Sequence, residues 1–409
     1  MGEGAIAERQ QEREPEVSYG RNFWLLFGAT FALNFSANLF VLYPLQLVQF
    51  GASAKAIGAI VGVWSLASLL ARPAAGTLIE RVGRRNSATW LLSLDVLIVL
   101  LYLPIHSIGW QIYAVRAVHG VVEGTARVGL FALLYDLLPK GREGRARATF
   151  SLCGLGAGTV APFCGEFLIR HLGFGAFFAG VLFVTAASAL LVSRIPSDSP
   201  QHRADAHLAR ASADSGGYLQ LLANSRLMPL WIVTLMFALS ISSRLSFVAP
   251  FAYERGIAQV GTYFAVYSVM GVAVRIFSGR LIDNFGLERT LAPSMAVLAI
   301  GIALIGATGR CGMLDIAGAI GGIGHGYLYP VLSAMVIART ELGATGRSSS
   351  IYQSLYDIGA MVGPYGLGAL AGAAGYGPMF VVSGALALIG AMYFITADPD
   401  ALSQTGVNR

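Results

Sequence analysis

The stretch that decides the fold is RPAAGTLIERVG at residues 72–83, which recurs as RIFSGRLIDNFG at residues 275–286. The two copies align without a gap, separated by about half of the 409-residue chain. In each copy an arginine, a glycine, a carboxylate and a final glycine keep the same spacing. A turn that repeats at half the chain length predicts two equivalent halves, each folded around its own copy.

Two shorter repeats support the same division. The His-Gly pair at 119–120 recurs at 325–326, and Pro162 recurs as Pro364. A single long polar interval separates the first copies of these repeats from the second copies. We therefore predict an N-terminal bundle at residues 1–195, a cytoplasmic linker at 196–226 and a C-terminal bundle at 227–409.

Composition indicates a membrane protein. Hydrophobic residues make up 55% of the sequence and charged residues only 12%, whereas a soluble domain carries roughly a quarter charged residues. The net charge of +6 would suit a nucleic-acid partner only if the basic residues clustered on a solvated face, and here they lie between apolar segments. We therefore expect neither a large soluble enzyme nor a nucleic-acid-binding protein.

The cysteines lack the spacing of a disulfide framework or a zinc site. Cys153 and Cys164 lie in one apolar segment, and Cys311 lies far from both. We expect no metal site and no cofactor.

Apolar runs of about 18 residues or more, long enough to cross a bilayer, recur along the whole chain. They predict an all-α membrane protein with twelve transmembrane helices in two pseudo-symmetric six-helix bundles. The predicted segments are residues 23–48, 56–79, 88–105, 110–135, 148–171, 174–193, 228–251, 261–282, 290–308, 312–337, 350–372 and 376–396.

Basic residues set the predicted orientation. Most of the 28 lysines and arginines fall on the side that holds the N-terminus, and outside the helices only Lys55, Arg170, Arg255 and Arg310 fall on the other. Because positive charge marks the cytoplasmic side, we expect both termini and the linker in the cytoplasm. The chain is then a multi-pass protein of the plasma, or inner, membrane, with the lipid bilayer as its surroundings.

The loop GTLIERVGRR at residues 76–85 lies between the second and third predicted helices. It resembles the signature loop of the major facilitator superfamily, Gly-x-Leu-x-Asp-Arg-x-Gly-Arg-Arg, with Glu80 in place of the aspartate. RAVHG, beginning at Arg116, resembles the arginine motif of the family's fourth helix. DLLP, beginning at Asp136 and followed by arginines, resembles its cytoplasmic loop between helices 4 and 5. The resemblance implies a membrane transporter.

The chemistry of this loop suits a latch that closes the cytoplasmic side. Its glycines permit close helix approach and a tight reversal, and its carboxylate can accept hydrogen bonds at the positive N-terminus of a helix from the other half. Arg81 or Arg84 can pair with Asp136. Simple positive-inside anchoring would explain the arginines but not the glycine and carboxylate spacing. The predicted latch residues are Gly76, Glu80, Arg81, Gly83, Arg84 and Asp136, with Gly279, Asp283 and Gly286 from the second copy.

The fourth predicted helix carries an ionisable stripe. At about 100° per residue, its four ionisable side chains fall within a sector of roughly 80°. Such groups are costly in lipid, so the stripe should face protein or a water-filled cavity. The alternative is a purely structural set of ion pairs at i and i+4 within the helix. The stripe consists of Arg116, His119, Glu123 and Arg127.

Further polar groups occur in the other predicted helices, and we assign them to two tasks. Buried carboxylates and histidines can carry or relay protons, which makes Glu123, Asp357, His119 and His325 the candidates for proton coupling. The candidates for the substrate cavity are Asn34, Asn38, Arg116, Arg127, Arg244, Tyr329 and Gln353.

Two ion pairs follow from depth and spacing. Asp95 lies at a depth similar to that of Arg127, so the two can pair. Glu166 and Arg170, at i and i+4 near the outer end of the fifth helix, are expected to form a structural pair. The glycines of that helix and Pro162 partly resemble the antiporter motif of drug-efflux members, but Ala161 and Glu166 depart from it.

These features favour a secondary active transporter that moves a small organic solute by rocker-switch alternating access, most simply as proton-coupled efflux. A nucleotide-binding Gly-x4-Gly-Lys-Ser/Thr loop is absent from the sequence, and no catalytic constellation has a recognisable spacing. The expected partners are a small-molecule substrate and protons, and the expected state is a monomer. The alternatives are uptake or facilitated diffusion of an organic anion, favoured by the intramembrane arginines, and a transporter-like receptor that moves nothing.

Overall fold

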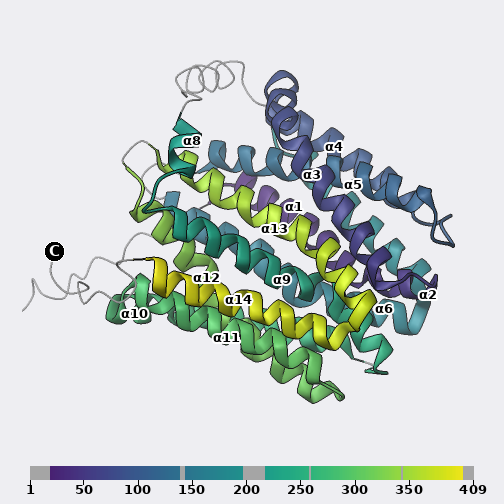
Figure 1. Cartoon of the computed structure of the whole chain (residues 1–409). Coiled ribbons are helices and arrows are strands. Elements are labelled where there is room, and N and C mark those ends of the chain that lie inside the picture. The colour runs from purple at the N-terminus through teal and green to yellow at the C-terminus, as the bar shows by residue number, and fades with distance from the viewer. Residues whose placement is uncertain (1–18, 139–142, 197–216, 258, 342–343, 399–409) are drawn as a thin grey trace, which may run out of the picture.

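Helices make up almost all of the described part of the chain. The computed structural model describes residues 19–138, 143–196, 217–257, 259–341 and 344–398, and these ranges contain no strand. This confirms the all-α prediction. The helices, labelled in Figure 1, are α1 (Arg21–Leu39), η2 (Phe40–Leu42), α2 (Tyr43–Gln49), α3 (Ala54–Val82), α4 (Arg84–Leu100), α5 (Trp110–Leu137), α6 (Glu143–Ser193), α8 (Gly217–Leu222), α9 (Met228–Glu254), α10 (Val260–Phe285), α11 (Leu287–Ala307), α12 (Cys311–Ala338), α13 (Thr345–Ala374) and α14 (Tyr376–Ala397).

Eight helical segments of the described chain are long and apolar enough to cross a membrane. All of the predicted segments coincide with helices, but α4 has only 17 residues, and α13 carries polar groups such as Gln353 and Asp357. The number of crossings therefore stays a prediction. The eight segments are Arg21–Gln49, Ala54–Val82, Trp110–Leu137, Leu152–Ser193, Met228–Glu254, Leu287–Ala307, Cys311–Ala338 and Tyr376–Ala397.

Two predicted segments meet inside one long helical stretch. The 51-residue helix α6 is interrupted at Gly173, whose φ of 81° is not helical. This residue lies in the gap between the predicted segments 148–171 and 174–193. The first predicted segment, in contrast, is kinked: α1 ends at Leu39, one 3₁₀ turn follows, and α2 begins with Pro44 in its first turn, where a missing N–H is tolerated.

The helix junctions repeat between the halves of the chain. Gly83 joins α3 to α4 with a φ of 93°, and Gly286 precedes α11 with a φ of 78°. Glycine is the residue that adopts such angles with little strain. The positive-φ glycines of the described chain form matching pairs about half a chain apart: Gly51 with Gly256, Gly83 with Gly286, and Gly173 with Gly375.

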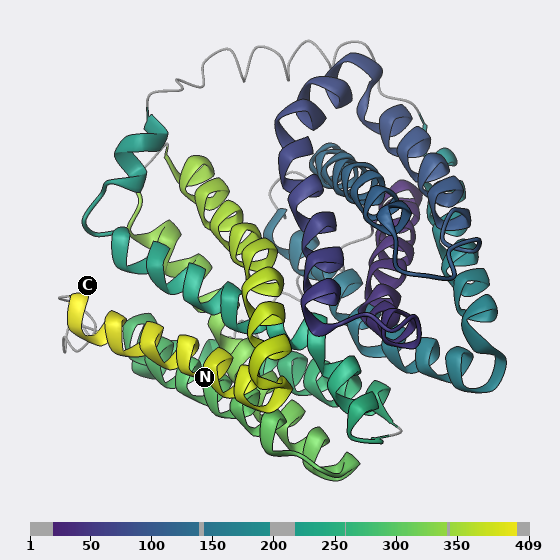
Figure 2. The ribbon, with the colours of Figure 1, turned by 45° about the vertical axis from the view of Figure 1, so that its right-hand side comes forward.

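The helices of each half pack mainly against helices of the same half. In the first half α1 packs on α6 and α3 on α5, while in the second α11 packs on α12 and α14. The halves meet chiefly along two helix pairs, α3 with α13 and α6 with α10. Figure 2 shows that α3 and α13 converge where α3 begins and diverge where α3 ends.

Small residues permit close contact between the halves at the converging end. A Cβ atom on Gly58 of α3 would collide with the backbone carbonyl of Pro364 on α13. A Cβ atom on Gly261 of α10 would lie 2.9 Å from the Cα atom of Phe163 on α6. Glycine thus lets the helix backbones approach each other directly.

The hydrophobic cores follow the same division. One cluster, which includes Phe23, Leu92 and Leu130, belongs to the first half alone and lies at the diverging end. The other runs from Tyr102 in the first half to Phe380 in the second. The two halves therefore share a core at one end only.

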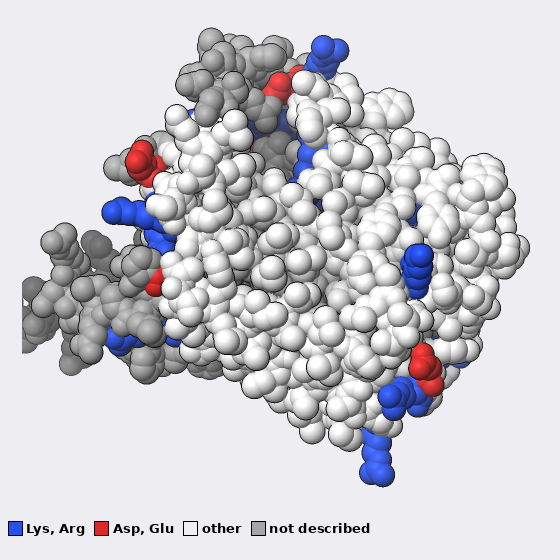
Figure 3. Space-filling model, in the orientation of Figure 1, with Lys and Arg blue, Asp and Glu red and all other residues white. Residues whose placement is uncertain are grey.

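Charged side chains leave a broad belt of the surface free. On the face in Figure 3 they gather towards opposite sides of the molecule, and most of the area between them is uncharged. Large apolar side chains are exposed, with Leu70 at 69%, Trp90 at 73% and Phe183 at 74%. An apolar surface of this extent matches lipid rather than water.

Candidate functional site

A cavity of about 240 Å³ lies between the two halves of the chain. Its walls come from α1, η2, α2, α3 and α5 of the first half and from α9 and α13 of the second. Several predicted site residues meet here, because α1 and α5 direct their polar positions to the same space. The polar and charged residues of the wall are Asn34, Asn38, Ser65, Arg116, Glu123, Arg127, Ser242 and Ser246.

Three of the four residues of the ionisable stripe on α5 are buried, and Arg127 is partly exposed. Arg116, His119 and Glu123 are 5%, 1% and 3% exposed. Both helix-internal pairs that the spacing allows are present, with Glu123 Oε1 2.6 Å from Arg127 Nη2 and Glu123 Oε2 3.5 Å from His119 Nε2. The stripe also contacts other helices, so it does more than stabilise α5 internally.

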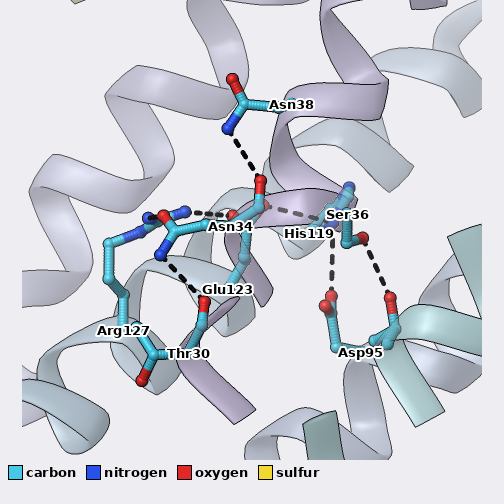
Figure 4. A network of polar contacts seen from close by, with 9 residues as sticks. Thr30, Asn34, Ser36, Asn38, Asp95, His119, Glu123 and Arg127 are labelled. Atoms are coloured by element: carbon cyan, nitrogen blue, oxygen red, sulfur yellow. Dashed lines mark hydrogen bonds and ion pairs between the residues drawn. The ribbon is translucent and has the colours of Figure 1, made fainter. Parts of the chain in front are cut away.

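Arg127 joins α5 to α1. Its Nη1 donates to the Asn34 side-chain oxygen at 2.8 Å, while its Nη2 binds Glu123 (Figure 4). Asn34 and Asn38 each donate to a backbone carbonyl one turn earlier in α1, at 2.9 and 2.8 Å. Glu123 thus pairs with the arginine that links two helices of the cavity wall.

Asp95 of α4 is fully buried and faces His119 rather than Arg127. His119 Nε2 lies 3.3 Å from Asp95 Oδ1, and the Tyr102 hydroxyl lies 2.9 Å from His119 Nδ1. The expected pairing of Asp95 with Arg127 is therefore wrong, because Arg127 extends along α5 to the carboxylate one turn earlier. One imidazole instead stands between Asp95 and Glu123, as Figure 4 shows.

Arg116 lies among aromatic rings. Its guanidinium carbon is 5.5 Å from the ring centre of Phe40, 5.6 Å from that of Tyr43 and 5.8 Å from that of Trp64. Its Nε donates weakly, at 3.5 Å, to the carbonyl of Ile60. Cation–π contacts partly replace the water that the charge has lost.

Asp357 of α13 pairs with Arg72 of α3, across the two halves. Gln353 Nε2 donates to Asp357 at 3.3 Å, and the Tyr329 hydroxyl donates to Gln353 Oε1 at 3.2 Å. Tyr329, Gln353 and Asp357 thus form one chain of contacts outside the wall of the 240 Å³ cavity. Sequence reasoning missed Arg72, although this arginine opens the repeated stretch.

Arg244 and His325 also lie away from the cavity wall. The guanidinium carbon of Arg244 sits 4.0 Å from the ring centre of Tyr267, and the His325 ring lies 5.5 Å from that of Phe237 and 5.6 Å from that of Tyr267. His119 and His325 match in the sequence repeat, and both lie against aromatic rings. They differ in that His119 also faces two carboxylates, those of Asp95 and Glu123.

At the predicted latch, Arg84 is the arginine that pairs with Asp136, and it also donates to the carbonyl of Ala132 at 3.2 Å. Arg81 is exposed at the end of α3. Gly76 and Glu80 lie in the last turns of α3, and Gly83 and Gly286 form matching turns. The side chain of Asp283 and the surroundings of Gly279 lie outside what the structure describes.

Glu166 has a role that its spacing from Arg170 did not predict. Its carboxylate accepts backbone hydrogen bonds from Val260 at 3.0 Å and Gly261 at 2.5 Å, the first residues of α10. A carboxylate at a helix N-terminus is stabilised by the free N–H groups and the helix dipole. Glu166 thus caps the N-terminus of a helix from the other half. The sequence predicted this kind of contact for Glu80, whereas Glu166 makes it at the converging end.

Solved structures with the same arrangement are transporters. The nucleoside transporter NupG matches 93% of this chain and 100% of its own with a TM-score of 0.79 at 10% identity. A POT family transporter in complex with a thioalcohol-conjugated peptide matches 94% of this chain and 97% of its own with a TM-score of 0.75 at 12% identity. The human organic anion transporter MFSD10 matches 91% and 98% with a TM-score of 0.64 at 16% identity. At these identities the likeness shows the fold alone.

Sequence relatives cover almost the whole chain. The multidrug resistance protein MdtG of Salmonella arizonae is 26% identical over 92% of this chain and 95% of its own length. MdtG of Serratia proteamaculans is 27% identical over 92% and 93%. The family model of the Major Facilitator Superfamily matches residues 25–306 and 251–408. As the loop at residues 76–85 predicted, the chain belongs to the Major Facilitator Superfamily of membrane transporters.

Proposed function

We propose that this multi-pass membrane transporter exports a small organic solute by rocker-switch alternating access coupled to protons. The observation that carries the proposal is the placement of the α5 stripe. Three of its members, Arg116, Glu123 and Arg127, line a cavity between two halves that are tightly packed at one end only. A solute bound there is shared by both halves, so their relative tilt decides which side of the membrane it reaches.

Two six-helix bundles give the simplest reading of the helices. The first corresponds to residues 1–195 and the second to residues 227–409, with the linker 196–226 between them and twelve membrane crossings in all. The matched glycine junctions, such as Gly83 with Gly286, support this division, and so does the packing of each half mainly on itself. The monomer is the functional unit in this proposal, because the cavity is complete within one chain.

The described conformation is proposed to face the cytoplasm. With both termini cytoplasmic by the positive-inside rule, α3 begins at the outer face, where Gly58 packs on Pro364 and Glu166 caps α10. The diverging end is then the cytoplasmic end, in the inner membrane. In the outward-facing state the latch residues of the signature loop would close this end.

Proton coupling is assigned to the buried carboxylates. Glu123 holds both Arg127 and His119, so a proton on Glu123 would break its ion pair with Arg127 and loosen the link to Asn34 on α1. His119 stands between Glu123 and Asp95 and can pass a proton between them. Asp357 is the second candidate, because its pair with Arg72 crosses the two halves. His325, enclosed by aromatic rings, is a weaker relay candidate.

Efflux is favoured over uptake by the relatives. Curated relatives of nearly full length are multidrug resistance proteins, and these share about a quarter of their residues with this chain. The organic-anion alternative has one specific observation in its favour, which is the presence of Arg116 and Arg127 in the cavity wall. A receptor that moves nothing would show ligand binding without flux.

Flux measured in proteoliposomes tests the proposal. A ligand that raises the melting temperature of the purified protein is loaded in labelled form, and its accumulation under an imposed pH gradient is compared with counterflow at equal pH. Glu123→Gln should lose gradient-driven accumulation by tenfold or more and keep counterflow, because exchange of bound solute needs no net proton movement.

The comparison variant is Asp357→Asn. If Asp357→Asn alone loses accumulation while Glu123→Gln behaves as wild type, the proton site belongs on α13 and the assignment to α5 is wrong. If no stabilising ligand shows either kind of flux in the wild type, the transporter proposal fails in favour of a receptor.

A further inference from the structure

Polar groups without partners gather in the cavity wall. Trp64 Nε1 on α3 and Ser246 Oγ on α9 are buried, and neither has a hydrogen-bond partner in the described structure. Both residues line the 240 Å³ cavity. A buried donor without an acceptor is costly and rare, so two of them in one small cavity indicate that a ligand supplies the acceptor.

Arg116 lies on the same wall, next to Trp64. Within the described chain it donates to the Ile60 carbonyl at 3.5 Å and to the Tyr102 hydroxyl oxygen, and no carboxylate lies within ion-pair distance of it. A guanidinium has five N–H donors, so most of them stay available. The aromatic contacts with Phe40 and Trp64 hold the group in place without neutralising its charge.

The charges of the wall leave one positive group uncompensated. The described ionisable residues of the wall are Arg116, Glu123 and Arg127. Glu123 and Arg127 neutralise each other at 2.6 Å. The charge that a solute meets in the cavity is therefore that of Arg116.

We propose that the transported solute is an organic anion, with its carboxylate, sulfonate or phosphonate group bound by Arg116, Trp64 Nε1–H and Ser246 Oγ–H. The inference rests on the proposed transport function and names its substrate class. An anionic oxygen accepts charge-assisted hydrogen bonds from all three groups. The apolar remainder of the wall, including Val41, Val61 and Leu245, receives an apolar body.

The arrangement also connects binding to movement. Arg116 and Trp64 belong to the first half and Ser246 to the second. An anion held by all three bridges the halves at the point about which they would tilt. A neutral or cationic solute lacks this bridge, and a cation would also meet the charge of Arg116.

Three probes of one shape test the substrate class: 1-naphthaleneacetate, its neutral amide 1-naphthaleneacetamide, and the cation 1-naphthylmethylammonium. Binding to purified full-length protein is measured by thermal shift and titration calorimetry. The anion should bind at least tenfold more tightly than the other two. Arg116→Gln, Trp64→Phe and Ser246→Ala should each weaken anion binding roughly tenfold, as expected for the loss of a hydrogen bond to a charged group.

Matched controls use the same substitutions on the exposed face of α4. Trp90→Phe and Ser93→Ala remove an indole N–H and a hydroxyl from residues outside the cavity, so both should bind the anion as wild type does. Trp64→Phe keeps an aromatic ring and Ser246→Ala keeps the helix, so correct folding is checked by a melting temperature without ligand that is no lower than that of wild type.

Equal binding of the three probes would overturn the inference, and so would wild-type anion affinity in Trp64→Phe and Ser246→Ala. Counterflow separates this result from a failure of transport. If all three variants transport the cationic probe at the wild-type rate, the transport function stands and the anion site is rejected. Anion binding that depends on the three residues, without flux, would keep the site and reject transport.

Discussion

At the scale of single residues, Arg72 and Asp357 form a charge contact between the two halves, and the proposed tilt of the halves would change it. Its side chains are 34% and 21% exposed, so both charges are partly desolvated. Removing one partner of such a pair leaves the other charge uncompensated. The chain through Gln353 to Tyr329 extends this contact from α13 to α12.

A charge exchange tests whether this pair acts between the halves. Arg72→Asp and Asp357→Arg should each lower transport at least tenfold, because like charges then face each other across α3 and α13. The double variant Arg72→Asp/Asp357→Arg should recover to within about threefold of wild type, since coupled sites are not additive. The readout is initial flux per inserted protein. A double variant as slow as the worse single variant would remove the pair from the mechanism.

At the scale of elements, glycine junctions determine where one helix ends and the next begins. At Gly83 the φ of 93° and ψ of 145° are essentially restricted to glycine. This one residue is both the C-cap of α3 and the N-cap of α4. Gly286 has a φ of 78° and a ψ of 162° before α11. The signature loop therefore repeats as a backbone conformation as well as a sequence.

Alanine at these junctions should strain the turn. Gly83→Ala and Gly286→Ala are each expected to lower the free energy of unfolding in detergent by about 1–3 kcal/mol. Gly366→Ala is the matched control, because Gly366 is helical and a Cβ there meets nothing within 4 Å, so it should be neutral or slightly stabilising. Denaturant titration followed by circular dichroism measures all three. Equal stability of the Gly83 and Gly366 variants would contradict the junction argument.

Sequence patterns predicted the elements better than their contacts. The break at Gly173 and the junction at Gly83 fall where apolar runs stop, because run length and turn residues are local properties. Which side chains meet depends on how each helix is rotated about its axis. Asp95 and Arg127 match in depth, yet Asp95 meets His119.

Long-range partners were the least predictable part of the site. Arg72 was visible as the first residue of the repeat, but its partner on α13 becomes evident only when the halves are placed side by side. The α5 stripe was predictable, because four ionisable groups at helical spacing in an apolar segment need a polar environment. The unpartnered state of Trp64 had no signal in the sequence.

At the scale of the whole molecule, closure at one end and divergence at the other define the proposed working cycle. The converging end, which is the outer end in the proposed orientation, holds Gly58 against Pro364 and the Glu166 cap on α10. The opposite end holds a core that belongs to the first half alone. In the proposed cycle the contacts at the converging end open while the diverging ends approach each other.

Distances between spin labels on the two halves test this central claim most directly. In a variant without native cysteines, one pair is placed at Ser53 and Ala374 near the outer end, and a second at Val82 and Gly346 near the cytoplasmic end. A third pair at Val82 and Leu101, within the first half, serves as the control. Double electron–electron resonance is recorded with and without a transported ligand, and with protein trapped at low and high pH.

We expect opposite changes in the first two pairs. When the protein changes to the outward-facing state, the distance between labels 53 and 374 should lengthen while that between labels 82 and 346 shortens. The control distance should stay constant. Rocker-switch movement would be contradicted if both inter-half distances stayed fixed under every condition, or if they lengthened and shortened together.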